Sequence, residues 1–152
     1  MIQPHHIRRL FDKLWPGMHA SAAHRDHCLT ILPRLESCFR KWGNDTDNLL
    51  DCVAGPDSIG STIASGLIWS ITPRSAVPFE KRTMAYALQK RIPSSPRILN
   101  GNYSKACQKI TIYCDTFVYN KQNGSERRYE IKDFVRYALQ EASGYEWSPS
   151  PI

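Results

Sequence analysis

The chain has 152 residues, of which 41% are hydrophobic and 22% charged, and its formal net charge is +6. This length suits one domain with a sizeable core, and the balance of apolar and charged residues excludes intrinsic disorder. The excess of basic residues favours acidic partners such as nucleic acid, an anionic membrane surface or an acidic protein, and a slightly basic solvated surface is the alternative.

The first third of the chain shows helical periodicity. Ile7, Leu10, Phe11 and Leu14 predict a helix from Pro4 to Trp15, which Pro16 and Gly17 end. A second helical region opens near Ser21, and Pro33 either kinks it or begins a new helix. A short helix follows an acidic loop at 44–48; its apolar residues are Leu49, Leu50 and Val53.

The middle of the chain predicts a central helix. Ile59, Ile63, Leu67 and Ile71 follow one another at steps of four, with Asp57 or Ser58 as the cap and Pro73 as the end. Gly60 and Gly66 would each cost about 1 kcal/mol relative to Ala inside a helix, so we expect another element to pack closely against both.

A basic helix is predicted next, from Pro78 to about Ile92. Its buried stripe consists of Met84, Ala85, Leu88 and Ile92. The opposite face is cationic and aromatic; it carries Phe79, Arg82, Tyr86, Gln89 and Lys90. Residues 93–102, rich in proline and serine, predict an exposed loop that carries Arg97.

The last third of the chain is partly ambiguous. Residues 104–119 fit either a helix or a strand, and the stretch FVYNKQNGSERRYEI predicts a hairpin with its turn near Asn123 and Gly124. A final helix follows, with a core face of Ile131, Phe134, Val135, Ala138 and Ala142. We therefore expect a mainly α fold, a compact bundle of five to six helices in one domain at 1–147. A β-hairpin near 110–131 stays open, and 148–152 form a loose tail.

The five cysteines show no regular spacing and no CxxC pair; they are Cys28, Cys38, Cys52, Cys107 and Cys114. We expect reduced thiols, mostly buried. The N-terminal MIQPHHIRRL lacks the apolar run of a secretory signal, and IASGLIWSI is too short to cross a bilayer. These features predict a cytoplasmic protein without membrane association, and no cofactor or metal is expected.

Positive charge is concentrated in residues 74–109. This segment holds eight Lys and Arg against one acid, Glu80, a net charge of +7. Basic side chains displace counterions from phosphates, and aromatic rings stack on bases, so the segment predicts a nucleic-acid-binding surface. The predicted contacts are Arg82, Tyr86, Lys90, Arg91, Arg97, Tyr103, Lys105 and Lys109. The alternative is a solvated basic face, or one paired with acids elsewhere in the chain. Arg128, Lys132 and Arg136 form a second basic stripe only if the last helix begins before Arg128.

Two weaker patterns suggest metal or nucleotide sites. His24 and His27 can share a helical face with Cys28 nearby, and a zinc site there would need Cys38 or Cys52 as its fourth ligand; solvent-exposed or capping histidines are the alternative. GPDSIGST at 55–62 resembles a Walker A phosphate loop in which Ser61 replaces the lysine, so a capped helix start is the better interpretation.

A catalytic alternative rests on Asp115, Glu130 and Lys132. If both segments are strands of one hairpin, the pattern resembles the D…ExK core of the restriction-endonuclease-like nucleases over about residues 110–142. That resemblance implies that the carboxylates hold a divalent ion and that the lysine polarises the attacking water.

The first prediction is a non-catalytic nucleic-acid-binding protein, an accessory subunit of a nucleoprotein assembly with other protein subunits as further partners. A protein-binding adaptor or inhibitor that presents the same basic surface to an acidic partner is the second, and the metal-dependent nuclease is the third.

Overall fold

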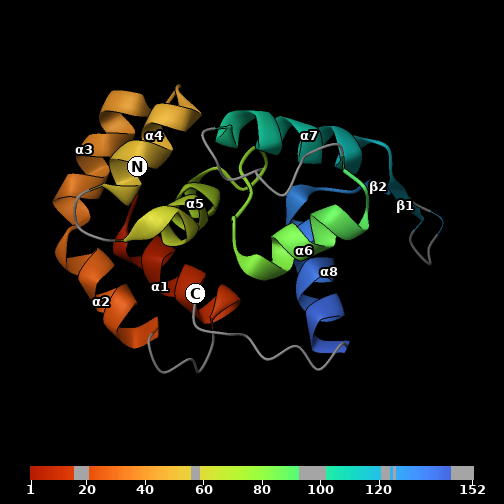
Figure 1. Cartoon of the computed structure of the whole chain (residues 1–152), viewed down its shortest axis with the longest axis horizontal. Helices are drawn as coiled ribbons and strands as arrows, with labels where there is room; N and C mark the ends of the chain where they lie inside the picture. Colours follow the sequence, from red (N-terminus) through yellow and green to blue (C-terminus); the bar gives the residue numbers. More distant parts are fainter. Residues whose placement is uncertain (16–20, 56–58, 93–101, 121–123, 125, 145–152) are drawn as a thin grey trace.

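The computed structural model describes residues 1–15, 21–55, 59–92, 102–120, 124 and 126–144 (Figure 1). These residues form eight α-helices and two short strands. The elements are α1 (Pro4–Leu14), α2 (Ser21–Thr30), α3 (Leu32–Trp42), α4 (Thr46–Ala54), α5 (Gly60–Ile71), α6 (Lys81–Gln89), α7 (Tyr103–Asp115), β1 (Val118–Asn120), β2 (Glu126–Arg128) and α8 (Ile131–Gly144). The mainly helical class is confirmed, and the predicted count of five to six helices is too low for the part of the chain described.

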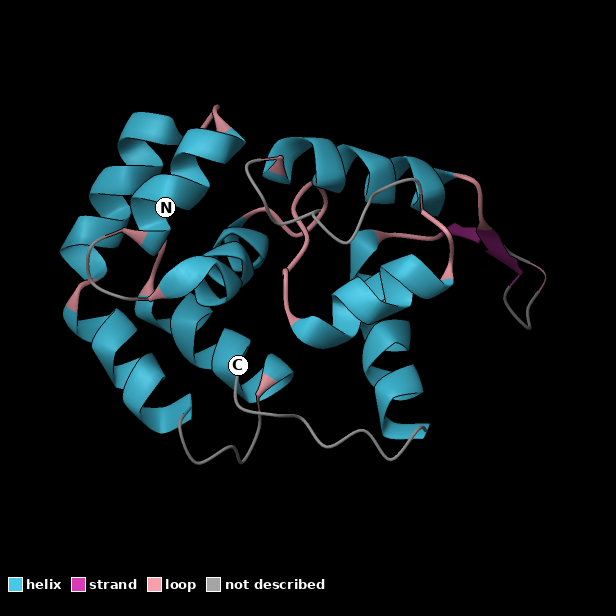
Figure 2. Cartoon of the chain, viewed as in Figure 1, coloured by secondary structure: helices cyan, strands magenta, loops and turns pink. Residues whose placement is uncertain are grey.

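The helices form two groups that lie side by side in Figure 1. In the first group, α5 packs against α1 and α4, α4 packs against α3, and α1 packs against α2. In the second, α8 contacts α6 and α7. The helix α7 also contacts α4, so it bridges the two groups. The strands are a small projection at the edge of the second group (Figure 2).

A buried extended segment, residues 76–80, runs between the two groups. All five of its residues are buried, and its backbone is held from both sides. The amide of Phe79 donates to Ser65 Oγ on α5 at 2.7 Å, and the hydroxyl of Tyr103 on α7 donates to the carbonyl of Val77 at 2.8 Å. The rings of Phe79 and Tyr103 meet edge to face at 4.7 Å between centroids. Buried apolar residues from both groups consequently form one contiguous core.

The helix α6 begins three residues later than predicted. Glu80 is its N-cap: the amide of Thr83 donates to Glu80 Oε1 at 2.8 Å, and the amide of Glu80 donates to Thr83 Oγ1 at 3.3 Å. This reciprocal capping box fixes the first turn after Glu80, since the preceding residues are extended. Pro78 therefore lies outside the helix.

The predicted faces of α6 are wrong in part: Ile92 is buried, Met84 is half-buried, and Gln89 and Lys90 are exposed, all as predicted, but other residues differ. Thr83, Tyr86 and Ala87 face the core, while Ala85 is exposed and Leu88 is 43% exposed. The reason is the contact with α8, where the rings of Tyr86 and Phe134 lie 5.0 Å apart in an edge-to-face arrangement. An aromatic pair buries more apolar surface than Leu88 could in its place.

The ambiguous stretch that begins at residue 104 is helical in α7. The hairpin is shorter than the predicted span of 110–131, because 110–115 belong to α7. It pairs Val118 with Arg128, Tyr119 with Arg127, and Asn120 with Glu126 in antiparallel register. Gly124 lies in the turn with a φ of +82°, a conformation that favours glycine.

The two glycines of α5 serve different purposes. A Cβ on Gly66 would lie 3.3 Å from the methyl carbons of Leu10, so α1 packs closely there, as predicted. A Cβ on Gly60 would meet nothing within 4 Å, and the φ of Gly60 is +83°. The prediction of close packing at Gly60 is therefore wrong. A glycine suits this position because the backbone has a positive φ where it turns into α5.

The prediction that all five cysteines are reduced is wrong. Cys38 on α3 and Cys52 on α4 form a disulfide, since the packing of α3 against α4 brings their Cα atoms to 5.7 Å. Cys28, Cys107 and Cys114 are free and buried. Among the described helices, none combines the length and the apolar character needed to cross a membrane. The predicted caps Asp57 and Ser58, the side chain of Ala142, and the tail with Trp147 lie outside the described residues.

Candidate functional site

Four of the predicted nucleic-acid contacts remain accessible. Lys90, Arg91 and Lys105 are exposed, and Lys109 is half-exposed. Within the described part of the chain, none of the four forms an ion pair with a carboxylate, although Lys90 Nζ lies 5.2 Å above the ring of Tyr86. Their charges are therefore available to an external anion.

Arg82 belongs to the interior instead. Its side chain is only 12% exposed, and its Nε donates to Glu80 Oε2 at 2.6 Å. A second nitrogen of the guanidinium donates to the carbonyl of Leu14 at the end of α1. Arg82 thus neutralises a fully buried carboxylate and joins α6 to α1, so its predicted contact with a phosphate is wrong for this structure.

Tyr86 and Tyr103 are also buried and cannot stack on a base in this structure. Tyr86 packs against Phe134, and Tyr103 is completely buried between the two helix groups. Burial raises the pKa of Tyr103 well above its ordinary value, which keeps its hydroxyl protonated as a donor to Val77. Both rings consequently stabilise the core. Arg97 lies outside the described residues.

The accessible cations form two pairs at different places. Lys90 and Arg91 follow the end of α6, whereas Lys105 lies in the first turn of α7 and Lys109 one turn later, at its middle. In Figure 1, α6 ends on the side of the view where α7 also ends, away from the beginning of α7. The predicted single cationic and aromatic face is therefore replaced by two separate basic clusters.

The second basic stripe does not form, because Arg128 lies on β2 and not on α8. All three of its residues lie close to acids. Arg128 pairs with Asp115 at 2.5 Å, Lys132 with Glu130 at 3.3 Å, and Arg136 with Asp133 at 3.4 Å.

The D…ExK hairpin is not present. Asp115 is the last residue of α7, Glu130 lies between β2 and α8, and Lys132 is in the first turn of α8, so none of the three is on a strand. Each also has an ion-pair partner: Arg128 for Asp115, and Arg74 as well as Lys132 for Glu130. The resemblance depends on these residues being on strands, and that prediction is wrong.

In the described residues, neither the predicted zinc site nor the phosphate loop has the geometry that it would need. Cys38 and Cys52 are bonded to each other, so neither offers the thiolate that a zinc site with His24 and His27 would need. Across the described ranges, no three His, Cys, Asp or Glu side chains converge into a group that could hold a metal ion. In the stretch 55–62, Gly60 to Thr62 form the first turn of α5, and residues 56–58 lie outside the description.

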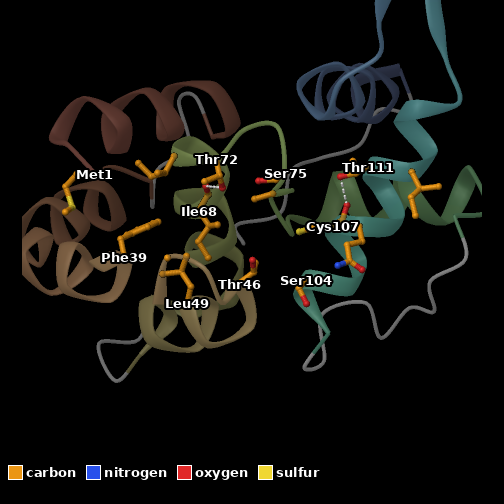
Figure 3. A pocket seen from close by; sticks show the side chains of 15 residues that line it. Met1, Phe39, Thr46, Leu49, Ile68, Thr72, Ser75, Ser104, Cys107 and Thr111 are labelled. Atoms are coloured by element: carbon orange, nitrogen blue, oxygen red, sulfur yellow. Dashed lines mark hydrogen bonds between the residues drawn. The ribbon is translucent and has the colours of Figure 1, made fainter. Parts of the chain in front are cut away.

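A groove of about 690 Å³ opens between the two helix groups (Figure 3). Its lining comes from α3, α4 and α5 on one side and from α7 on the other. The lining residues are Met1, Phe39, Gly43, Thr46, Leu49, Ile68, Ile71, Thr72, Ser75, Ala76, Ser104, Cys107, Gln108, Thr111 and Ile112. No Asp, Glu, Lys, Arg or His is among them. Figure 3 shows Thr46, Ser75 and Ser104 in the middle of the view, between the two sides.

Comparison of the chain with known protein families, with curated proteins and with solved structures finds no match.

Sequence reasoning missed the groove entirely. Its lining residues are spread from position 1 to position 112 and belong to several helices, and no local pattern joins them. The one sequence signal that could have pointed to it is Ile112, an apolar residue whose neighbours on the exposed side of a helical α7 are Lys105, Gln108 and Lys109.

Proposed function

We propose that this chain binds nucleic acid through the phosphate backbone, as a non-catalytic accessory subunit. The observation that carries the proposal is a set of four accessible cations that have no carboxylate partner among the described residues, Lys90, Arg91, Lys105 and Lys109, in a chain with a net charge of +6. Unpaired surface cations release counterions from phosphates, and this release drives most binding that is independent of base sequence.

The mode of binding follows from what the structure buries. Since Tyr86 and Tyr103 are core residues, the described part of the basic segment offers no ring for base stacking. The contacts that remain are ionic, and ionic contacts to phosphates fix position without reading bases. We therefore expect little preference among base sequences and a strong dependence on salt.

The test is fluorescence anisotropy with single-stranded RNA, single-stranded DNA and duplex DNA over a salt series, with and without Mg²⁺. Each lost phosphate contact lowers the slope of log affinity against log salt by about 0.7 to 0.9. The double variant Lys105→Glu/Lys109→Glu should lower this slope by about 1.4 to 1.8 and weaken binding at least about tenfold at low salt.

The matched control is Arg40→Glu/Lys41→Glu. These two residues are exposed on α3, outside the basic segment, and the double reversal changes the net charge by the same amount. Binding should survive this control. Equal loss in both variants would show an effect of net charge alone, and no binding at low salt would also contradict the proposal. Binding of polyglutamate without binding of nucleic acid would favour the adaptor for an acidic protein instead.

The predicted cytoplasmic location needs its own test. Structural disulfides are typical of oxidising compartments, and the bond between Cys38 and Cys52 argues against a reducing one. Acid trapping of thiols in cells, followed by mass spectrometry of the peptides containing Cys38 and Cys52, distinguishes the two. A fully reduced pair would support the cytoplasm, and a bonded pair would contradict it.

A further inference from the structure

The groove between α7 and the first helix group has the dimensions of a ligand site. Its volume of about 690 Å³ is within the range of roughly 300 to 1,000 Å³ typical of small-molecule pockets. Four large apolar side chains are well exposed in the described structure, and two of them, Met1 at 60% and Ile112 at 65%, line this groove. Apolar surface of this kind marks a place where binding would remove it from water.

Three hydroxyl groups that line the groove have their protons committed to acceptors within the chain. Thr72 Oγ1 donates its proton to the carbonyl of Ile68 at 2.9 Å, and Thr111 Oγ1 donates to the carbonyl of Cys107 at 2.8 Å. Figure 3 marks both bonds. Ser104 Oγ donates to the carboxylate of Asp47 at 2.8 Å. A hydroxyl has one proton and two lone pairs, so each of these three oxygens can only accept from a ligand.

The electrostatic character of the groove points the same way. The carboxylate of Asp47 lies next to Ser104 and accepts hydrogen bonds from its amide at 3.0 Å and from its hydroxyl at 2.8 Å. Cys107, also in the lining, is a buried thiol whose pKa rises to about 11, so it is neutral near pH 7. None of the lining side chains is charged, so a charged ligand would leave water without gaining an ion pair from them.

We infer that this groove binds a small, predominantly apolar and uncharged molecule that carries a hydrogen-bond donor, such as a hydroxyl or an amide N–H. The apolar body lies against Leu49, Ile68 and Ile112, and the donor meets the acceptor oxygens of Thr72, Ser104 or Thr111. Lys105 and Lys109 are neighbours of the lining residues Gln108 and Ile112 on α7, but neither lysine lines the groove, so either proposal can fail without the other.

The test compares three ligands of the same shape by NMR titration of the full chain: 4-hydroxybiphenyl, 4-methoxybiphenyl and biphenyl-4-carboxylate. The hydroxyl compound should shift the amide resonances of Gln108, Thr111 and Ile112. The methoxy compound has lost the donor and should bind about three to ten times more weakly, the effect of one hydrogen bond. The carboxylate should bind more weakly still.

Two variants locate the site. Gln108→Trp should fill the groove from an exposed position on α7 and abolish the shifts, whereas Gln140→Trp, at an exposed position on α8 outside the groove, should leave them unchanged. Thr72→Val/Thr111→Val keeps the shape of both side chains and removes two acceptors, so the ratio of the affinities for the hydroxyl and methoxy compounds should fall towards one.

Three results would overturn the inference. The first is no saturable binding of 4-hydroxybiphenyl. The second is equal affinity for all three ligands, which would mean that the hydroxyl oxygens do not select a donor. The third is binding that Gln108→Trp leaves intact, which would place the ligand elsewhere on the molecule.

Discussion

Arg34 and Arg82 place their guanidinium groups at the C-terminal ends of other helices. Arg34 donates to the carbonyls of Cys52 and Val53 at 2.7 and 3.0 Å, at the end of α4, and Arg82 donates to the carbonyl of Leu14 at the end of α1. The last carbonyls of a helix lack partners within it and carry partial negative charge. Two of the cations in this basic chain therefore stabilise the fold and are not available to bind a partner.

The Glu80 and Arg82 pair gives a first prediction. Arg82→Met leaves the carboxylate of Glu80, which is fully buried, without its counter-charge, so the free energy of unfolding should fall by about 3 kcal/mol. Urea denaturation followed by circular dichroism measures the change. The reversal Arg82→Glu, which the charge pattern suggests as a test of nucleic-acid binding, would unfold the protein for the same reason and is unsuitable.

The double variant Glu80→Gln/Arg82→Met is the control for this prediction. It removes both charges and keeps an acceptor for the amide of Thr83, so it should recover part of the loss. If Arg82→Met were as stable as the parent chain, the ion pair between Glu80 and Arg82 would contribute no net stability.

The three free cysteines give a second prediction, on pH. Burial raises the pKa of Cys28 and Cys114 to about 12 and that of Cys107 to about 11. The unfolded thiols ionise near pH 9 and the folded ones do not, so unfolding releases protons above that pH. Stability should be fully present below pH 8 and fall on the order of 1 kcal/mol per thiol by pH 10. Urea midpoints at pH 7.5, 9 and 10 measure it, and Cys114→Ala should reduce the slope.

At the level of secondary structure, the disulfide joins α3 to α4 and gives a third prediction. Cys38 and Cys52 enclose a sequence separation of 14 residues, and closing a loop of about this size stabilises a protein by roughly 3 kcal/mol. The variant Cys38→Ser/Cys52→Ser should lose about this amount in oxidising buffer. Urea unfolding with and without reductant measures it. In reductant, the parent chain and the variant should have the same stability, and a difference that persists there would contradict the prediction.

The helices were predictable where local chemistry determines them. Prolines and glycines between apolar repeats separate α1, α3 and α4, and the apolar face of α8 at Ile131, Phe134, Val135 and Ala138 is confirmed. The orientation of α6 was not predictable, because Tyr86 and Leu88 are both plausible core residues and only the position of Phe134 on α8 decides between them. The hairpin was placed too broadly, since Ile110 and Thr111 suit a strand locally and pack as part of a helix.

For the molecule as a whole, the contacts between the two helix groups yield a fourth prediction. Trp15, Trp42 and Trp69 belong to the first group, and α8 belongs to the second. Since one core runs through both groups, tryptophan fluorescence and the amide resonances of α8 should report the same urea midpoint. A Trp147→Phe background keeps the fluorescence within the first group. Loss of α8 at a lower urea concentration would indicate two independent units.

The variant Tyr103→Phe is a second test of the contacts between the two helix groups. It deletes the hydroxyl that donates to Val77 and leaves a buried carbonyl with one bond fewer, at a cost of about 1 kcal/mol. Both midpoints should fall together if the groups unfold as one. A shift confined to α8 would show that the hydroxyl stabilises only its own group.

The candidate sites differ in how much of them a sequence can reveal. Net charge is a sum over residues, so the basic segment was visible, and its accessible members Lys90, Arg91, Lys105 and Lys109 were all among those predicted. Burial depends on distant partners, and for that reason Arg82, Tyr86 and Tyr103 were misplaced. The groove depends on the packing of α7 against α4, which no periodicity in the sequence expresses.

The bond from Arg82 to Leu14 spans 68 residues of chain and bears on how the protein is made. On the ribosome, α1 is synthesised first, and the arginine that completes its end follows roughly 3 to 14 s later at ordinary rates of translation. For most of that interval α5, which packs against α1, has not been completed either. The apolar face of the nascent α1 is thus available to a ribosome-associated chaperone until α5 and Arg82 follow.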